Sequence, residues 1–176
     1  MENGQRLRAN RKHRPASDAY GRCIEGVIYY LAKANYGTVV MSFDVRSEKF
    51  DMIGVPPKYC RKLVTYKGWL ACFDAWDDRR FWILEDAQKQ IWSVEQELLS
   101  PSADFGRGFK LTGSTHAGEF IYVPKRDSRL FYVLLCDPVR NSWRRFEFEM
   151  SVRNEEIHRT YALYAFPNHI DSQISL

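Results

Sequence analysis

The residue types able to carry out catalysis are scattered along this chain of 176 residues. Its four histidines are far apart in the sequence and outline no common site: His13, His116, His158 and His169. His116 follows Ser114 by two residues, but no G-x-S-x-G nucleophile elbow is present. We therefore expect a hairpin with a polar turn at this point and no catalytic residue.

Two pairs of neighbouring acids, Asp77-Asp78 and Glu155-Glu156, offer general acid–base chemistry. Such catalysis needs carboxylates that face one pocket from different environments. Both pairs lie in charged, loop-like stretches, which favours a solvated surface. The Gly106-Arg107-Gly108 segment lacks the spacing of a phosphate-binding loop. The sequence thus predicts that the chain is not an enzyme and binds no cofactor.

The cysteines do not match a metal site. Cys23, Cys60, Cys72 and Cys136 include no C-x-x-C pair and have no histidine at zinc spacing. No secretory leader is visible, and no run approaches the 18 apolar residues of a membrane span. We expect no metal, no membrane partner, four free thiols and a cytoplasmic or nuclear location.

Composition predicts a folded chain with a basic tail. Hydrophobic residues make up 45% and charged residues 27%, as in globular domains, and the 15% of aromatic residues favours strands. Residues 1–20 hold five Arg or Lys and two acids, so most of the +4 net charge lies there. We interpret 1–20 as an unstructured arm and 21–176 as the folded domain. The arm could serve as a nuclear-import signal, as a segment that contacts phosphate groups, or only as a solvated tail. Because no aromatic residues alternate with its basic residues, we do not expect nucleic acid to be the partner.

Short apolar runs separated by turn residues predict an all-β fold. Clean alternation in Trp143–Met150 predicts one apolar face, with Phe146, Phe148 and Met150. Short helical turns are expected over Asp86–Ile91 and Asn154–His158. The predicted strands are Val27–Ala32, Thr38–Asp44, Leu63–Tyr66, Trp69–Asp74, Phe81–Leu84, Lys110–Thr115, Glu119–Val123, Leu130–Asp137 and Trp143–Met150.

An internal repeat is the most informative pattern in the sequence. Each repeat has a glycine, an aspartate 18 or 19 residues later, and an aromatic six residues after that. Successive aspartates are 42 and 51 residues apart, a spacing typical of propeller blades. The three sets are Gly26, Asp44 and Phe50; Gly68, Asp86 and Trp92; and Gly118, Asp137 and Trp143.

Each repeat position has a physical role in this interpretation. The glycine lets the chain reverse where a Cβ would clash. The aspartate accepts hydrogen bonds from backbone N–H groups one or two residues on and so holds a turn. The aromatic places its ring between adjacent sheets. We therefore expect these residues to be structural.

In these repeats the sequence resembles the F-box-associated type 3 domain of plant F-box proteins, from about residue 21 to the end. The segments that carry the resemblance are Cys23–Tyr30, Ser42–Phe50, Tyr66–Gly68, Trp82–Gln90, Trp92-Ser93, Ala117–Glu119 and Asp137–Ser142. Proteins of this family join an F-box, which docks on the Skp adaptor of a cullin–RING (SCF) ubiquitin ligase, to a kelch-like, propeller-type region that selects the substrate. Residues 1–20 contain nothing like an F-box, so the resemblance implies Skp as a partner only if an unrecognised docking segment exists.

Three repeats are fewer than the four to eight blades of a closed propeller. We expect an open stack of about three four-stranded antiparallel sheets, with few short helices. An apolar edge on its N-terminal side would need a cover: a partner chain, a second copy or the arm.

The resemblance implies a non-enzymatic module that binds a protein substrate or partner chain. Two alternatives are a nuclear protein that contacts nucleic acid through the arm and a non-functional truncated paralogue. One loop combines a large aromatic with dense charge, as protein-binding hot spots do. It comprises Trp76, Asp77, Asp78, Arg79 and Arg80.

Overall fold

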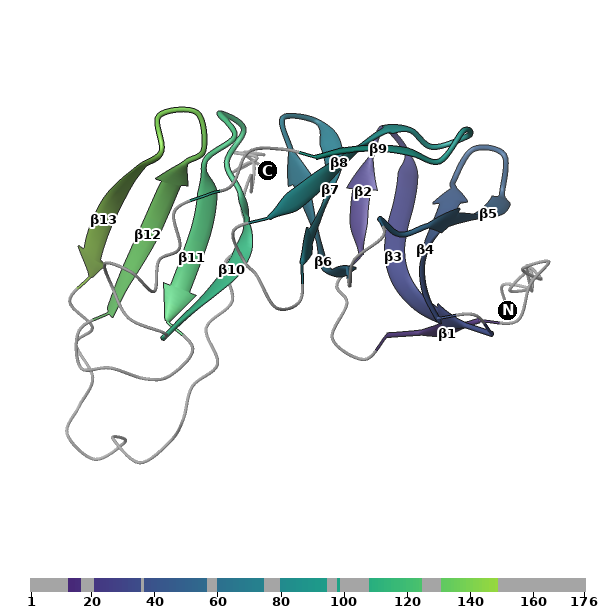
Figure 1. Ribbon diagram of the computed structural model, residues 1–176, viewed down its shortest axis with the longest axis horizontal. Helices are drawn as coiled ribbons and strands as arrows, with labels where there is room; N and C mark the ends of the chain where they lie inside the picture. Colours follow the sequence, from purple (N-terminus) through teal and green to yellow (C-terminus); the bar gives the residue numbers. More distant parts are fainter. Residues whose placement is uncertain are drawn as a thin grey trace, which may run out of the picture. The chain divides into compact units, whose positions relative to one another are not determined.

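The computed structural model describes residues 13–16, 21–35, 37–56, 60–74, 80–94, 98, 108–124 and 131–148. These residues form thirteen β-strands and no helix, so none of them makes a helical membrane span (Figure 1). The strands make three antiparallel sheets, none of which closes on itself. The predicted all-β class is confirmed. The chain divides into two compact units, Met1–Glu95 and Gln96–Leu176.

Sheet A is the first of two sheets in the N-terminal unit. Its strand order is β1-β3-β4-β5, and β2 also pairs with β3. In β1, Arg14 and Pro15 pair with Lys33 and Ala32, so this part of the expected arm belongs to the sheet. The rest of that arm, 1–12 and 17–20, lies outside the described residues. The strands are β1 (Arg14–Pro15), β2 (Arg22–Ile24), β3 (Val27–Ala34), β4 (Gly37–Asp44) and β5 (Lys49–Gly54).

Sheets B and C are four-stranded meanders. Sheet B, in the N-terminal unit, has the order β6-β7-β8-β9, and sheet C, in the C-terminal unit, has the order β10-β11-β12-β13. The strands of sheet B are β6 (Cys60–Tyr66), β7 (Trp69–Asp74), β8 (Phe81–Asp86) and β9 (Ile91–Val94). Those of sheet C are β10 (Phe109–Ser114), β11 (Phe120–Pro124), β12 (Phe131–Asp137) and β13 (Ser142–Phe148).

Sheets A and B pack face to face around one hydrophobic core. Leu31, Val40 and Ile53 of sheet A meet three leucines of sheet B, and all six side chains are almost fully buried. Burial of each such side chain contributes roughly 1.5–3 kcal/mol relative to its exposure to water. Removal of apolar surface from water therefore holds the two sheets together. The leucines of sheet B are Leu63, Leu70 and Leu84.

The core also contains a disulfide between Cys60 and Cys72, so the expectation of four free thiols is wrong. The two cysteines are 12 residues apart in the sequence, on β6 and β7, and come together only when these strands pair. Cys23 is free and exposed, and Cys136 is free and buried. Burial, with a smaller effect of the Asp137 charge, raises the pKa of the Cys136 thiol to about 12.

Every predicted strand overlaps an observed one. The helical turn expected over Asp86–Ile91 is wrong, because this segment is the turn between β8 and β9 and the first residue of β9. The turn expected over Asn154–His158 lies outside the described residues. In the alternating segment, Phe146 is 42% exposed rather than buried.

Candidate protein-binding site

The repeat glycines occupy hairpin turns that require a left-handed backbone. Gly26 and Gly68 have φ of 80° and 85°, and the residues before them, Glu25 and Lys67, have φ of 49° and 48°. Two successive positive φ values are the signature of a type I′ two-residue hairpin. Gly118, with φ of 86°, closes a longer loop in which its N–H donates to the Thr115 carbonyl at 3.0 Å.

The repeat aspartates hold a second set of turns. In each, an Asp Oδ1 accepts the backbone N–H three residues on, and not only one or two residues on as expected: Ser47 to Asp44 at 2.7 Å, Lys89 to Asp86 at 2.9 Å and Arg140 to Asp137 at 3.1 Å. Asp137 also accepts the Val139 N–H, two residues on, at 2.9 Å. Backbone N–H donors chiefly lower the pKa of Asp44 and Asp86, since such bonds favour the ionised carboxylate.

Sequence reasoning missed the residue four positions after each aspartate. All three have positive φ, although none is glycine, because this position lets the chain enter the next strand. The common spacing was a usable signal, but the residue types differ. They are Glu48 (φ 56°), Gln90 (φ 57°) and Asn141 (φ 51°).

The three repeat aromatics have different surroundings. Phe50 packs against Phe43, with ring centroids 4.6 Å apart, and Trp143 lies edge-on to Tyr122 at 5.4 Å. Trp92 belongs to the core between sheets A and B, and its Nε1 donates to the Gly54 carbonyl at 2.8 Å. Within the N-terminal unit, Trp92 therefore contacts the neighbouring sheet in the way expected, whereas Phe50 does not.

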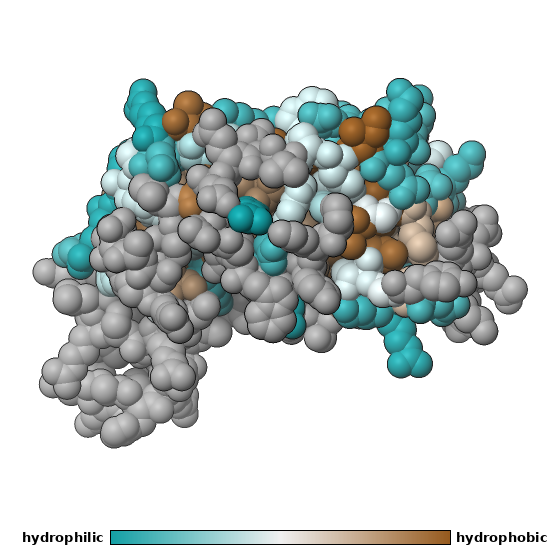
Figure 2. Space-filling model, viewed as in Figure 1, coloured by the Kyte–Doolittle hydropathy of each residue, from teal (hydrophilic) through white to brown (hydrophobic). Residues whose placement is uncertain are grey.

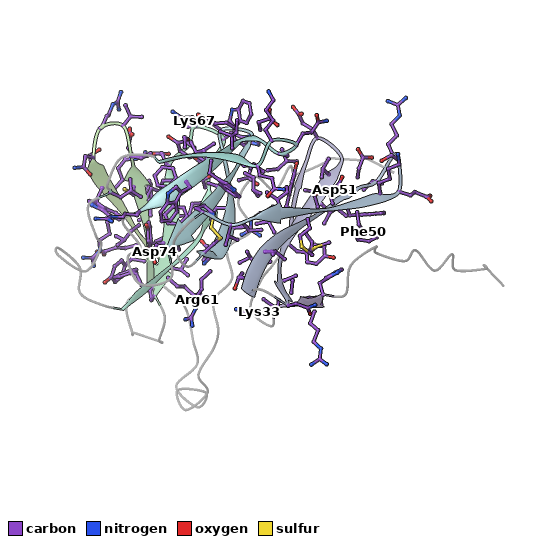
Figure 3. The ribbon with its side chains drawn as sticks, turned by 45° about the vertical axis from the view of Figure 1, so that its right-hand side comes forward. Lys33, Phe50, Asp51, Arg61, Lys67 and Asp74 are labelled. Carbon is purple, nitrogen blue, oxygen red and sulfur yellow. A yellow bond between two sulfur atoms is a disulfide. The ribbon has the colours of Figure 1, made fainter. Side chains whose placement is uncertain are left out.

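The glycine and aspartate turns lie at the same end of each sheet. In an antiparallel meander, the first and third connections share one end and the second lies at the other. In sheet A the two turns are bonded, since the Val45 N–H donates to the Gly26 carbonyl at 3.0 Å. Figure 3 shows Lys67, in the glycine turn of sheet B, at the end opposite Asp74 and Arg61. We call the turn-bearing end of sheets A and B the rim.

A pocket of about 340 Å³ opens at this rim between the two glycine turns. Its volume is near the lower end of the roughly 300–1,000 Å³ found for ligand sites. Polar and apolar surface line it in similar amounts, with Glu25 and Lys67 as the charged members. The apolar lining includes Ile24, Val27, Leu70, Leu84 and Ala87. The two sheets are in contact below the pocket but separate at the rim, which leaves room for a side chain from another molecule.

The polar groups of the pocket are an aromatic hydroxyl and two opposite charges. Burial raises the pKa of Tyr29, and the carboxylates of Glu25 and Asp44 raise it further. A tyrosine hydroxyl is ordinarily protonated at neutral pH, so this one can donate a hydrogen bond. The Lys67 Nζ lies 5.2 Å from the centre of the Tyr66 ring, in a cation–π contact.

Apolar side chains also reach solvent around the pocket. Trp69, which lines it, is 55% exposed, and Val45 and Ile91 are exposed in or beside the aspartate turns. Figure 2 shows apolar surface (brown) among hydrophilic residues in the part of the molecule formed by sheets A and B. A pocket with apolar side chains in its wall, an exposed tryptophan and charged groups can hold a protein side chain, because apolar area combined with polar groups is typical of protein-binding hot spots.

The predicted binding loop lies at the other end of sheet B, between β7 and β8. Trp76, Asp77, Asp78 and Arg79 are outside the described residues. Arg80 is half-buried, and its carbonyl accepts the Asp74 N–H at 3.1 Å. The pocket and this loop are therefore separate candidates for protein binding.

Of the catalytic candidates considered above, the structure describes the Ser114 and His116 pair and places the two residues in different environments. His116 is exposed in a turn, whereas Ser114 is buried in β10. Asp77-Asp78, Glu155-Glu156 and Gly106-Arg107 lie outside the described residues. Within the part of the chain that is described, no group of three or more His, Cys, Asp or Glu side chains is placed to hold a metal ion.

Comparison with known proteins extends the resemblance over nearly the whole chain. The family model described as "F-box associated beta propeller domain" matches residues 2–170. Two similar proteins of Arabidopsis thaliana are "Putative F-box protein At1g47790" and "Putative F-box protein At3g10240", 43% and 41% identical over 97% and 96% of this chain. The aligned regions cover 48% and 47% of those proteins, so the chain spans about half the length of the curated relatives it matches. The glycine, aspartate and aromatic repeat, the three antiparallel sheets and this match together show that the chain belongs to the F-box associated beta propeller domain family.

Proposed function

We propose that this chain is a non-enzymatic protein-interaction module that binds its partner at the rim of sheets A and B. Family membership supports the general class, because the relatives are named F-box proteins. The observation that carries the proposal is the pocket between the Glu25-Gly26 and Lys67-Gly68 turns, with the exposed Trp69 on its border.

The pocket suits one apolar side chain of the partner. Leu70 and Leu84 give it an apolar wall, so an inserted side chain would lose its own contact with water. Tyr29, Glu25 and Lys67 then offer a hydroxyl, a carboxylate and an ammonium group to the polar backbone around that side chain. Apolar burial would supply affinity and these polar groups would supply orientation.

Within an F-box protein, such a module would select the protein that the cullin–RING ligase modifies. In this proposal the module supplies recognition, and attachment to the ligase requires a separate contact with the Skp adaptor. Purification of the tagged chain from plant extract tests that second part directly. Recovery of Skp and cullin subunits would support attachment, whereas a partner recovered without them would limit the chain to recognition.

Site-specific photo-crosslinking tests the binding surface. A photoreactive phenylalanine in place of Trp69 should crosslink the partner, whereas the same probe in place of Val139, 70% exposed in sheet C, should not. Ala87→Phe should fill the pocket and weaken binding at least about tenfold, which corresponds to roughly 1.4 kcal/mol. Equal crosslinking at both positions, or unchanged binding by the Ala87→Phe variant, would refute this site.

A further inference from the structure

The contact between sheets A and B shows which kinds of sheet face fit together. We call the face that carries the repeat aromatic the ring face of a sheet, and the opposite face its back face. Phe50 pairs with Phe43 and Trp143 with Cys136, in each case the residue before the repeat aspartate, whereas a register shift in β8 pairs Trp92 with Leu84, two residues before Asp86. In the core, the ring face of sheet B, with Leu84 and Trp92, packs against the back face of sheet A, with Val40 and Ile53.

Two side chains of sheet B bind the edge of sheet A. The Gly54 N–H donates to Gln90 Oε1 at 2.9 Å, and Trp92 Nε1 donates to the Gly54 carbonyl at 2.8 Å. A Cβ at Gly54 would lie 3.2 Å from that Gln90 oxygen, so the sheets approach closely here. A ring face therefore meets a back face through an apolar core and through hydrogen bonds to the outer strand.

The ring face of sheet A is apolar, and no other described sheet of its unit covers it. Phe50 and Met52 on β5 lie beside Phe43 and Met41 on β4, with Ile28 and Tyr30 on β3. Figure 3 places Phe50 on the side of sheet A turned away from sheet B. Ile28 is 37% exposed, and Phe50, Phe43, Met52 and Tyr30 are half-buried, whereas Met41 is 2% exposed. The Tyr30 hydroxyl also forms a hydrogen bond with His13 at 2.7 Å. The corresponding face of sheet B is buried against sheet A.

The back face of sheet C is a matching surface in the other unit. Val133, four residues before Asp137, pairs with Phe146, nine residues after it. Val40 and Ile53 form the same pair at the same distances from Asp44 in sheet A. Val40 and Ile53 are 0% and 2% exposed beneath sheet B, whereas Phe146 is 42% exposed. On the same face of sheet C, Val133 is half-buried, Ile121 and Val123 are buried, and the Arg144 guanidinium lies 5.5 Å from the centre of the Phe146 ring. The opposite face of sheet C is closed, with Phe120 and Leu134 fully buried.

From this correspondence we propose that two copies of the chain associate head to tail, with the ring face of sheet A of one copy packed on the back face of sheet C of the other. The A–B contact is the template, with Phe50 in place of Trp92 and Val133 and Phe146 in place of Val40 and Ile53. Glu48 holds the position of Gln90, so its carboxylate can accept a backbone N–H from β13 of the second copy.

Measurement of the mass in solution tests this association. The chain has a mass of 20.7 kDa, and light scattering after size exclusion should give at least twice that value at about 100 μM, a concentration suited to dissociation constants of that order. Phe50→Asp and Phe146→Asp should each abolish this association, whereas Val139→Asp, an exposed position in the turn after Asp137, should retain it.

A mixture of the two variants gives the sharpest result. The Phe50→Asp chain keeps its sheet C face and the Phe146→Asp chain keeps its sheet A face, so an equimolar mixture should recover a heterodimer through one contact. If either variant fails to show a cooperative melt, Ile28→Asp and Arg144→Glu provide the same test on the two faces.

Three results would overturn the proposal. The first is a wild-type chain that is monomeric at 100 μM. If deletion of residues 1–12 from such a chain then produced a dimer, residues 1–12 and not a second copy would cover the ring face of sheet A. A Phe146→Asp chain that dimerises as well as the wild type would indicate pairing of two sheet A faces. A mixture that stays monomeric would exclude the contact between sheets A and C.

Discussion

Replacement of Gly68 by alanine tests whether the turn glycines are required by the backbone alone. Gly68 has φ of 85°, and a Cβ built at this position meets no heavy atom within 4 Å. Loss of stability in Gly68→Ala would therefore come from the left-handed conformation and not from a clash. For a residue with a Cβ that conformation costs roughly 1–2 kcal/mol.

Part of this cost is offset in the unfolded state, because alanine restricts the unfolded chain by roughly 0.4–1 kcal/mol relative to glycine. We expect a net loss of about 1 kcal/mol in the free energy of unfolding. Gly21→Ala is the matched control in the same unit, since its Cβ would make ordinary contacts at 3.4 and 3.7 Å and its φ lies outside the left-handed region. That variant should be as stable as the wild type or slightly more stable.

Urea denaturation followed by tryptophan fluorescence measures both variants. The slope of unfolding free energy against urea should stay constant, so that a shift in midpoint reports stability alone. If Gly68→Ala and Gly21→Ala change the midpoint equally, the left-handed turn does not limit stability, and the role assigned to the repeat glycines is wrong.

Three further predictions concern the remaining contacts. Trp92→Phe keeps an aromatic ring but removes the hydrogen bond to Gly54, so it should lower the unfolding free energy by about 1 kcal/mol in the same urea assay; an unchanged midpoint would contradict this. Backbone hydrogen bonds lower the pKa of Asp86 in the folded protein, so its ionised carboxylate stabilises the fold at pH values above the unfolded-state pKa of about 3.9. This contribution is lost as the pH falls through the folded-state pKa. Asp86→Asn should therefore make the melting temperature fall less steeply with acid, and an equally steep fall would contradict this prediction. Maleimide should modify the exposed Cys23 in the folded protein but Cys136 only after unfolding, because Cys136 is buried and its thiol has a pKa of about 12. Mass spectrometry that shows two modified thiols in the native protein would contradict the burial of Cys136.

The strands and turns could be predicted from the sequence because their causes are local. A type I′ turn needs two residues with positive φ, and Gly26 and Gly68 fill the second of these positions without steric cost. The aspartate turns are held by a bond that spans three residues, as between Asp44 and Ser47. Neither requirement depends on a distant part of the chain, so the spacing alone was enough to place them.

Burial and pairing depended on residues far apart in the chain. Phe50 and Trp92 have equivalent places in the repeat, but Trp92 meets Gly54 of a neighbouring sheet, 38 residues away, whereas no described sheet of the unit covers Phe50. Likewise, alternation predicted one apolar face for β13, but could not show that Phe146 would remain exposed.

What the sequence determined by itself is the repeating unit: its strands, its turns and the family to which the chain belongs. The tertiary structure decided which faces are covered, joined Cys60 to Cys72, and opened the pocket between two turns 42 residues apart. The physical reason is range. A turn depends on backbone angles and hydrogen bonds among adjacent residues, whereas a core, a disulfide or a pocket exists only after separate strands have packed.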